Sequence, residues 1–335
     1  MSVTDEARRT GRARWDGKPG RLEVWYATFT DRASGAGGWI HCETVAPDRS
    51  RAGAHSTGDG SPYAHGWISW FPTAGSPTTA RFGPVPTAPV SPATTSDDRP
   101  WFEAAGCTVG PGVMKGAAAG TSWDLRWHDE GRPLYTFPRL AWERELLPAA
   151  QIVVAPTATI EGTIDLRDVE GATQHLDVAA TGGLAHIYGQ GNALRWGWLH
   201  ADLGDGDLLE IVTAVSKKPG LNRLRPVCFA RFRVSGTDWP ASGLPGFRLR
   251  TQLGGHEWSV NGRIGRRRIA VTVRQPQDRC VALSYHDPDG ETATCTNTER
   301  ADVEVVVERR AGGTWVTEHR WQVVGTAHAE LGSRP

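Results

Sequence analysis

The stretch RWGWLHADLGDGDLLEIVTAVS, residues 195–216, has the pattern of a β-hairpin. Successive side chains of a strand point to opposite faces, so every second residue of its first half shares a face. Those residues are two tryptophans, a histidine and an aspartate: Trp196, Trp198, His200 and Asp202. The dipeptide Asp205-Gly206 supplies the positive φ of a tight turn. The stretch therefore predicts an antiparallel pair whose aromatic face is either a well-satisfied core or the wall of a pocket.

The register of this hairpin decides which residue faces His200. A two-residue turn at Asp205-Gly206 sets His200 opposite Ile211, whereas a three-residue loop sets it opposite Glu210. A slip of one residue exchanges the two faces of a strand, so only the second register lets Glu210 orient His200. The sequence leaves both registers open.

Similar short stretches of period-two alternation recur along the 335 residues. They are bounded by Gly, Pro, Asp and Asn, and long segments of helical period are almost absent. Two further turns are clear, at Asn261-Gly262 and in DPDG at 287–290. This pattern is typical of antiparallel sandwiches and barrels, so we predict an all-β protein.

A change in composition suggests where the chain divides. The stretch LPAAQIVVAPTATIEG, 147–162, places two prolines and an Ala-rich tract before a new set of strands, so we expect a boundary near Ala155. The predicted domains are 20–150 and 156–332, each with enough strands for a barrel of about eight. Two irregular insertions, 48–62 and 84–100, fall in the first domain. The second could be a flexible lid or a tolerated surface loop, and we favour the surface loop.

Composition argues against several classes of partner. Lys+Arg and Asp+Glu both number 37, so we expect no strong global field for nucleic acid or an anionic membrane, although a transient membrane-surface contact stays open. Five cysteines without a C-x-x-C motif are expected to be reduced, which fits a cytoplasmic protein. We find no apolar segment of a secretory signal and no run of membrane-helix length. The oligomeric state stays open.

Common catalytic motifs are missing from the sequence. It contains neither G-x-S-x-G nor G-x-x-x-x-G-K-[ST], and GQGNAL at 189–194 lacks the third glycine of a dinucleotide fingerprint. A metal site is conceivable from four residues, but their spacings match no compact ligand signature and we expect no metal: His175, His186, His200 and Asp202.

The richest constellation lies between 183 and 215, where His186 and Tyr188 share a face of the preceding strand. If these groups line a cavity, aromatic faces can stabilise a developing carbocation. A carboxyl in such a cavity has a raised pKa and can act as a general acid. The alternative is a satisfied core with Asp202 capping the hairpin. For Asp202 we favour the cap, and for His186 and His200 the two interpretations are balanced.

Three motifs resemble one known family. They are the opening GRLEVWYATFTDRASGAGGWIHCETVAP, the central HIYG followed by RWGWLH, and the closing CTNTERADVEV with GTAHAE. These are similar to motifs of the family that includes bacterial carotenoid 1,2-hydratases and plant tocopherol cyclases. The resemblance extends from about Arg21 to Glu330.

The resemblance implies two tandem lipocalin-like antiparallel β-barrels and a cofactor-free reaction on a hydrophobic isoprenoid or polyketide-like substrate. In the hydratases an acid protonates an alkene and water captures the cation, and in the cyclases a hydroxyl captures it. Fungal relatives shape linear polyenes for Diels–Alder cyclisation.

Residue by residue, the resemblance places His186 on the family's central histidine and Tyr188 where many members have tryptophan. The hydratases' acid lies on the strand after the hairpin, where Glu210 is the nearest candidate and Thr213 a competing match. Our first hypothesis is an enzyme with Glu210 or Asp202 as proton donor. The remaining site residues orient or relay, and shape the cavity: His186 and His200, then Tyr188, Trp196, Trp198 and Trp25. The rivals are a non-catalytic carrier of a lipid or pigment, and a structural or partner-binding β-protein.

Overall fold

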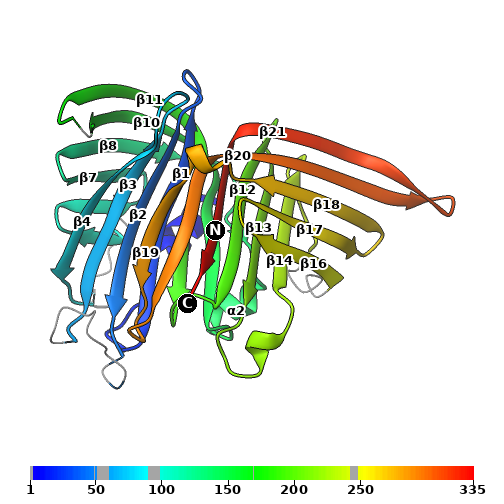
Figure 1. The fold of residues 1–335 in the computed structure, drawn as a ribbon, viewed down its shortest axis with the longest axis horizontal. Coiled ribbons are helices and arrows are strands. Elements are labelled where there is room, and N and C mark those ends of the chain that lie inside the picture. Colours follow the sequence, from blue (N-terminus) through cyan, green and yellow to red (C-terminus); the bar gives the residue numbers. More distant parts are fainter. Residues whose placement is uncertain (1–2, 49, 51–59, 90–98, 169, 242–247) are drawn as a thin grey trace. The chain divides into compact units, whose positions relative to one another are not determined.

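A computed structural model describes residues 3–48, 50, 60–89, 99–168, 170–241 and 248–335. Two antiparallel sheets account for most of the described chain, which confirms the all-β prediction (Figure 1). The chain divides into two compact units. Unit 1 contains 1–134, 140–191 and 285–292, and unit 2 contains 135–139, 192–284 and 293–335.

The first sheet runs in the order β4-β3-β2-β1-β11-β10-β8-β7-β6-β5, and β9 pairs with β10. Its strands are β1 (Arg21–Asp31), β2 (Gly37–Ala46), β3 (Tyr63–Phe71), β4 (Thr78–Pro86), β5 (Phe102–Ala104), β6 (Cys107–Gly110), β7 (Val113–Ala118), β8 (Thr121–His128), β9 (Leu134–Tyr135), β10 (Ala149–Arg167) and β11 (Thr173–Gly189).

The second sheet runs in the order β15-β14-β13-β12-β21-β20-β18-β17-β16, and β19 pairs with β20. Its strands are β12 (Arg195–Gly204), β13 (Asp207–Val215), β14 (Val227–Val234), β15 (Thr237–Trp239), β16 (Leu249–Gly254), β17 (Glu257–Ile264), β18 (Arg267–Arg274), β19 (Val281–His286), β20 (Thr292–Ala311) and β21 (Thr314–Ser333).

Helices are few and short in the part of the chain that the structure describes. They include α1 (Val3–Gly11), α2 (Arg139–Glu143) and the 3₁₀ turns η2 (Leu221–Arg223) and η4 (Gln277–Arg279). In the ranges that the structure describes, no helix has the length and apolar character needed to span a bilayer. α1 packs against β10 and β11, which brings its C-terminal end to the interior of unit 1.

The expected domain boundary near Ala155 falls inside β10, and the compact units divide instead after Gly191. β10 pairs with β8 on one side and β11 on the other, so it cannot serve as a linker. Pro156 sits at register shifts of the β10–β11 ladder, which occur between Val153 and Ala155 and between Ala155 and Ala158. A proline is tolerated at such a bulge because its missing N–H is not needed there.

The two units bury their strands differently. In unit 2 one face of β12 and β13 joins a continuous apolar core that includes Leu199, Ile211, Phe232 and Trp258. In unit 1 the central strands are buried on both faces, and every residue of β3 is buried. Polar side chains on either face of β1–β3 are therefore shielded from water.

Most residues of the two expected insertions, namely 49, 51–59 and 90–98, lie outside the described residues.

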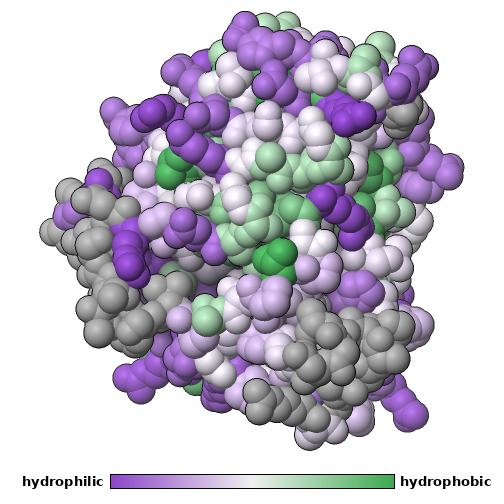
Figure 2. All heavy atoms as spheres, turned by 90° about the vertical axis from the view of Figure 1, so that its left-hand side faces the viewer, coloured by the Kyte–Doolittle hydropathy of each residue, from purple (hydrophilic) through white to green (hydrophobic). Residues whose placement is uncertain are grey.

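The face shown in Figure 2 is of mixed polarity, with hydrophobic residues toward its middle and hydrophilic residues around them. All five cysteines are free thiols, as expected.

Candidate functional site

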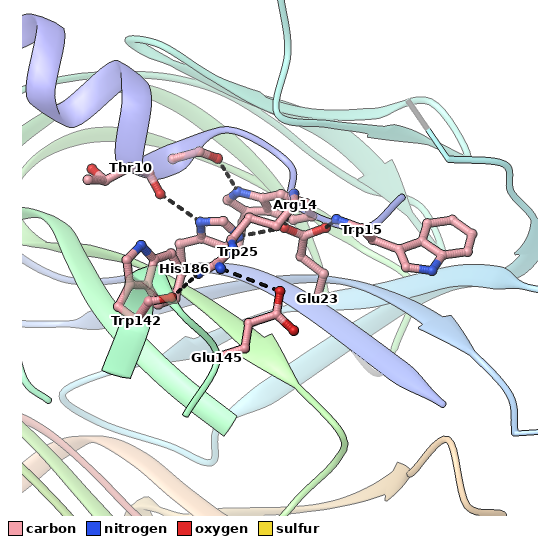
Figure 3. A network of polar contacts seen from close by, with 9 residues as sticks. Thr10, Arg14, Trp15, Glu23, Trp25, Trp142, Glu145 and His186 are labelled. Atoms are coloured by element: carbon pink, nitrogen blue, oxygen red, sulfur yellow. Dashed lines mark hydrogen bonds and ion pairs between the residues drawn. The ribbon is translucent and has the colours of Figure 1, made fainter. Parts of the chain in front are cut away.

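Glu23 and His186 form a buried pair in unit 1 (Figure 3). β1 and β11 are antiparallel neighbours with Trp25 opposite His186, so Glu23, two residues before Trp25, projects from the same face. Glu23 Oε1 lies 2.7 Å from His186 Nε2. Both side chains are almost completely excluded from solvent.

Both ring nitrogens of His186 face oxygen atoms. Nδ1 lies 2.7 Å from the carbonyl oxygen of Thr10, while Nε2 faces Glu23. A carbonyl oxygen can only accept, so Nδ1 carries a hydrogen. The contact between Nε2 and the carboxyl then needs one further proton, on the imidazole or on the carboxyl. The pair therefore stores a proton inside unit 1.

The C-terminal end of α1 completes this environment. The Thr10 carbonyl accepts from His186, and the Gly11 carbonyl accepts from Trp25 Nε1 at 2.7 Å. Carbonyls of a last helical turn have no partner within the helix and form the negative end of its dipole. The helix end thus fixes the Trp25 ring and the His186 imidazole.

Two backbone amides orient the carboxyl of Glu23. The N–H of Arg14 donates to Oε1 at 2.6 Å, and the N–H of Trp15 donates to Oε2 at 2.9 Å. Together with His186 these donors hold the carboxyl in one position. Glu23 is therefore a fixed group through which the stored proton can pass.

Aromatic rings enclose His186. Trp25 stacks on it with ring centroids 4.9 Å apart, and Trp142 meets it edge-on at 5.0 Å. The guanidinium of Arg14 lies 4.5 Å from the Trp142 ring and donates to the Trp142 carbonyl at 2.7 Å. Arg14 also lies 3.6 Å from Glu145. These contacts lock the imidazole in place.

A pocket of about 220 Å³ lies beside Glu23. Its wall includes Glu23 but not His186, which stands behind the carboxyl. The wall also contains aromatic residues and polar or charged residues: Trp15, Trp25, Trp101 and Phe102, and Thr44, Thr87, Arg99 and Glu103. A carboxyl coupled to a stored proton in an aromatic wall can protonate an alkene, and the ring faces can stabilise the cation that forms.

The end of α1 approaches this wall closely. A Cβ atom at Gly11 would lie 2.4 Å from the Trp101 ring, so only glycine fits there. The glycine thus allows the Gly11 carbonyl to reach Trp25 while Trp101 lines the pocket.

Tyr188 lies opposite Glu23 in the β1–β11 register. Burial raises the pKa of its phenol, and its ring lines a small recess with Trp142 rather than the pocket beside Glu23. The structure thus brings three sequence-predicted residues together in unit 1: His186, Tyr188 and Trp25.

In unit 2 the hairpin adopts the second of the two registers left open by the sequence. His200 lies opposite Glu210, because the ladder shifts by one residue between Asp202 and Gly204. Glu210 accepts from His200 Nδ1 at 2.9 Å and from Trp198 Nε1 at 2.5 Å. Burial lowers the pKa of His200, but the hydrogen bond to Glu210 and the negative charges of Glu210, Asp202 and Glu299 together outweigh this and raise it.

Asp202 stands apart from this cluster. Its side chain is exposed, and Oδ1 accepts from the N–H of Gly204 at 2.9 Å. Its geometry is that of the hairpin cap, and the structure gives no support to a proton-donor role for it.

Three residues that the sequence did not single out complete the cluster: Glu299 and His328, which are buried, and Glu330, which is partly buried. His328 Nδ1 lies 2.6 Å from Glu299, and its ring lies 3.8 Å from that of Trp198. Trp196 Nε1 donates to Glu330 at 2.6 Å. Burial lowers the pKa of His328 to about 3 and raises that of Glu330. The closing motif GTAHAE contained a signal for two of these residues, because His328 and Glu330 are two positions apart and therefore share one face of a strand.

This cluster lies on the face of β12 opposite to the apolar core of unit 2. Leu199 and Ala201 enter that core, so Trp198 and His200 point away from it. Side chains such as Phe232 fill the apolar core on the other face, so Trp198 and His200 lie outside that core.

A third polar cluster lies in unit 1, on the face of β2 and β3 opposite to Glu23. Glu43 Oε2 lies 3.2 Å from both His41 Nε2 and His65 Nε2. Burial would raise the pKa of Glu43, but the two imidazoles outweigh it and bring the pKa down to about 2. Trp67 stacks on His41 with centroids 4.0 Å apart. Sequence reasoning missed this cluster, although His41 and Glu43 alternate within one strand.

Within the described ranges, no group of three or more His, Cys, Asp or Glu side chains is arranged to hold a metal ion. His175, one of the residues considered for such a site, instead pairs with Asp165 at 2.6 Å on the surface of unit 1.

The chain is 51% identical over 334 residues to an uncharacterized protein, Rv0493c, of Mycobacterium tuberculosis H37Rv, covering 99% of this chain and 92% of the relative. The corresponding protein of strain CDC 1551, MT0513, gives the same identity and coverage.

Three solved structures share the fold. CghA with Sch210972 is 13% identical with a TM-score of 0.57, covering 94% of this chain and 88% of that one. A putative AttH from Nitrosomonas europaea is 14% identical with a TM-score of 0.53, covering 93% and 92%. Kievitone hydratase from Nectria haematococca is 10% identical with a TM-score of 0.51, covering 99% and 92%. These likenesses confirm a tandem lipocalin-like fold.

The profile of one protein family matches residues 19–333, which is nearly the whole chain, and its description is "Tocopherol cyclase-like". The match agrees with the three motifs that resemble carotenoid hydratases and tocopherol cyclases. The chain belongs to the tocopherol cyclase-like family.

Proposed function

We propose that this protein is a cofactor-independent enzyme that acts on a hydrophobic unsaturated substrate, isoprenoid or polyketide-like, by acid-assisted cyclisation or hydration. The reaction takes place in the pocket of unit 1. Glu23 delivers a proton to a carbon–carbon double bond, and His186 holds that proton behind it. Trp15, Trp25 and Trp101 stabilise the resulting cation.

The observation that carries this proposal is the position of Glu23. It is a carboxyl in the wall of an aromatic pocket, and it contacts an imidazole whose other nitrogen is already bound to a carbonyl. The protonated pair is thus ready before a substrate arrives. The names of the family and of kievitone hydratase support cyclisation and hydration as the reaction classes.

The polar part of the pocket wall bears on the substrate. Thr44, Thr87 and Arg99 lie in the same pocket as the tryptophans. A substrate with a hydroxyl or carbonyl group near its alkene would place the polar group against these residues. In a cyclisation that hydroxyl captures the cation, and in a hydration a water held by the polar wall captures it. The captured oxygen then loses a proton, which returns to the pair of Glu23 and His186.

The second candidate is a non-catalytic carrier of a lipid or pigment. It is favoured by the full hydrogen bonding of Glu23, which accepts from two backbone amides and His186. In a carrier, this carboxyl would have a structural role and would hold the segment that follows α1 against the sheet.

Native mass spectrometry of freshly purified protein, followed by solvent extraction, separates these candidates. We expect a bound isoprenoid or polyene, which the protein converts on incubation to an isomer or to a product heavier by one water. Release of the same compound unchanged, under all conditions of incubation, would establish the carrier. A bare mass together with no displacement of a fluorescent lipid probe would contradict both.

Substitution of Glu210 by glutamine tests the location of the acid. Glu210 binds Trp198 and His200 in unit 2, so we expect Glu210→Gln to lower the free energy of unfolding by about 1.5–3 kcal/mol. Turnover by the folded fraction should be retained. Urea unfolding and product analysis on one preparation measure both quantities, and a folded variant without turnover would place the acid in unit 2.

A further inference from the structure

The loop between β13 and β14 combines exposed leucines with positive charge (yellow-green in Figure 1). It reads SKKPGLNRLRP, residues 216–226. Leu221 and Leu224 are 47% and 60% exposed, which is unusual for large apolar side chains in this protein. Four basic residues stand beside them in the sequence: Lys217, Lys218, Arg223 and Arg225.

Backbone hydrogen bonds give the loop a defined shape. The N–H of Asn222 donates to the carbonyl of Lys218 at 3.0 Å, and the N–H of Leu224 donates to that of Leu221 at 3.1 Å. Leu221 begins the 3₁₀ turn η2 and Leu224 is its C-cap, three residues further on, where a turn of three residues returns to the same side. The two leucines therefore project together, and no ordering is needed to present them.

The charge around this loop has one sign. Residues 216–226 contain four basic residues and no acidic one, although the whole chain has a formal net charge of zero. Lys218, Arg223 and Arg225 are exposed, and in the described part of the chain they join no ion pair. The loop is thus a local cationic site on a neutral protein.

We propose that this loop docks unit 2 on an anionic lipid surface. Leu221 and Leu224 enter the boundary between headgroups and acyl chains, while the lysines and arginines contact lipid phosphates. Exposed apolar side chains flanked by cations are the combination that binds a membrane interface. A polyanion such as nucleic acid would use the cations and leave the paired leucines without a role. The inference rests on this loop alone and stands apart from the proposed reaction.

Vesicle flotation with the full-length protein tests the proposal. We expect binding to vesicles in which phosphatidylglycerol is about a third of the lipid, weaker binding to pure phosphatidylcholine, and loss of binding at high salt. Leu221→Ser/Leu224→Ser should lower the partition coefficient at least tenfold. Lys218→Gln/Arg223→Gln/Arg225→Gln should lower it about a hundredfold, at about fivefold per charge.

Matched variants elsewhere in unit 2 control for a general effect. Val316 and Val324 are 51% and 65% exposed on β21, and Val316→Ser/Val324→Ser should bind vesicles as the unchanged protein does. Arg250→Gln/Arg266→Gln/Arg310→Gln removes three exposed cations outside the loop. It should lower the partition coefficient much less than the substitution of the three basic residues in the loop.

Two results would overturn the proposal. One is equal binding of the loop variants and the unchanged protein to anionic vesicles. The other is retention on heparin without any binding to vesicles, which would assign the loop to a soluble polyanion. All variants lie in exposed segments, and unchanged thermal melts would show that each comparison concerns folded protein.

Discussion

Replacement of Glu23 by glutamine is expected to lower turnover by about 10²–10⁴-fold while leaving the affinity for the ligand nearly unchanged. Glutamine has the shape of glutamate, although its single carbonyl oxygen can accept from only one of the N–H groups of Arg14 and Trp15, which bind different carboxyl oxygens. It cannot take a proton from His186 and pass it on. The substitution therefore removes the proton path and preserves the pocket wall.

The measurement is single-turnover product formation, together with displacement of a fluorescent lipid probe from the same pocket. Glu103→Gln is the matched control, because Glu103 lines this pocket but is exposed and belongs to β5. It should retain turnover. Equal turnover in Glu23→Gln and the unchanged protein would exclude Glu23 as the acid, and loss of probe binding together with turnover would indicate a binding role.

His186 is a positioning residue under this proposal, and its substitution has a distinct signature. His186→Asn can still donate to the Thr10 carbonyl but cannot store a proton against Glu23. Turnover should then fall less than in Glu23→Gln and should change its dependence on pH. A purely structural His186 would instead lower stability and leave the pH profile of the folded fraction unchanged.

Much of the local pattern in the second half could be predicted from sequence. The alternation over 195–202 and the turn after Asp202 correctly placed Trp198 and His200 on one face. The register could not be predicted, because it depends on one extra residue in the turn. That bulge puts Glu210 rather than Ile211 opposite His200.

For β1 to β3, the sequence could not predict which face is buried, and the reason is different. Alternation identifies a core only where one face meets water, and β1 to β3 are buried on both faces. Alternation therefore gave no signal that distinguished Glu23 from the other polar residues of its strand. His186 and Trp25 could be found from motifs, but their partners on α1 lie about 15 to 180 residues away in the chain.

The predicted boundary near Ala155 falls in a long strand that contains features of a linker. Residues 147–162 are rich in alanine and proline, yet most of them belong to a 19-residue strand. Bulges around Ala155 absorb Pro156 without ending the strand. Composition alone does not distinguish such a bulged strand from a true connection.

Removal of the Glu43 carboxylate should produce the largest loss of stability in unit 1. Glu43→Ala leaves His41 and His65 buried without the group that both face, and we expect about 3–5 kcal/mol of destabilisation. Glu43→Gln should cost less, because its carbonyl can still accept from one imidazole. Glu161→Ala removes an exposed carboxylate from β10 and should change stability by less than about 0.5 kcal/mol.

The effect should depend on pH in a defined direction. The pKa of Glu43 falls from 4.5 to about 2 on folding, so its contribution is complete above pH 4.5 and is lost as the pH falls toward 2. A lowering of this size corresponds to about 3 kcal/mol. Burial also lowers the pKa of His41 below 6.5, so its contribution is lost as the pH falls below that value. Both groups make unit 1 less stable in acid.

Urea unfolding of the three variants and the unchanged protein, from neutral pH down to about pH 3, measures this directly. The difference between Glu43→Ala and the unchanged protein should shrink as the pH falls below 4.5, because protonation then removes the same charge that the substitution removes. A difference that stays constant with pH would mean that Glu43 acts through packing. A difference under about 1 kcal/mol at neutral pH would mean that water already solvates the two imidazoles.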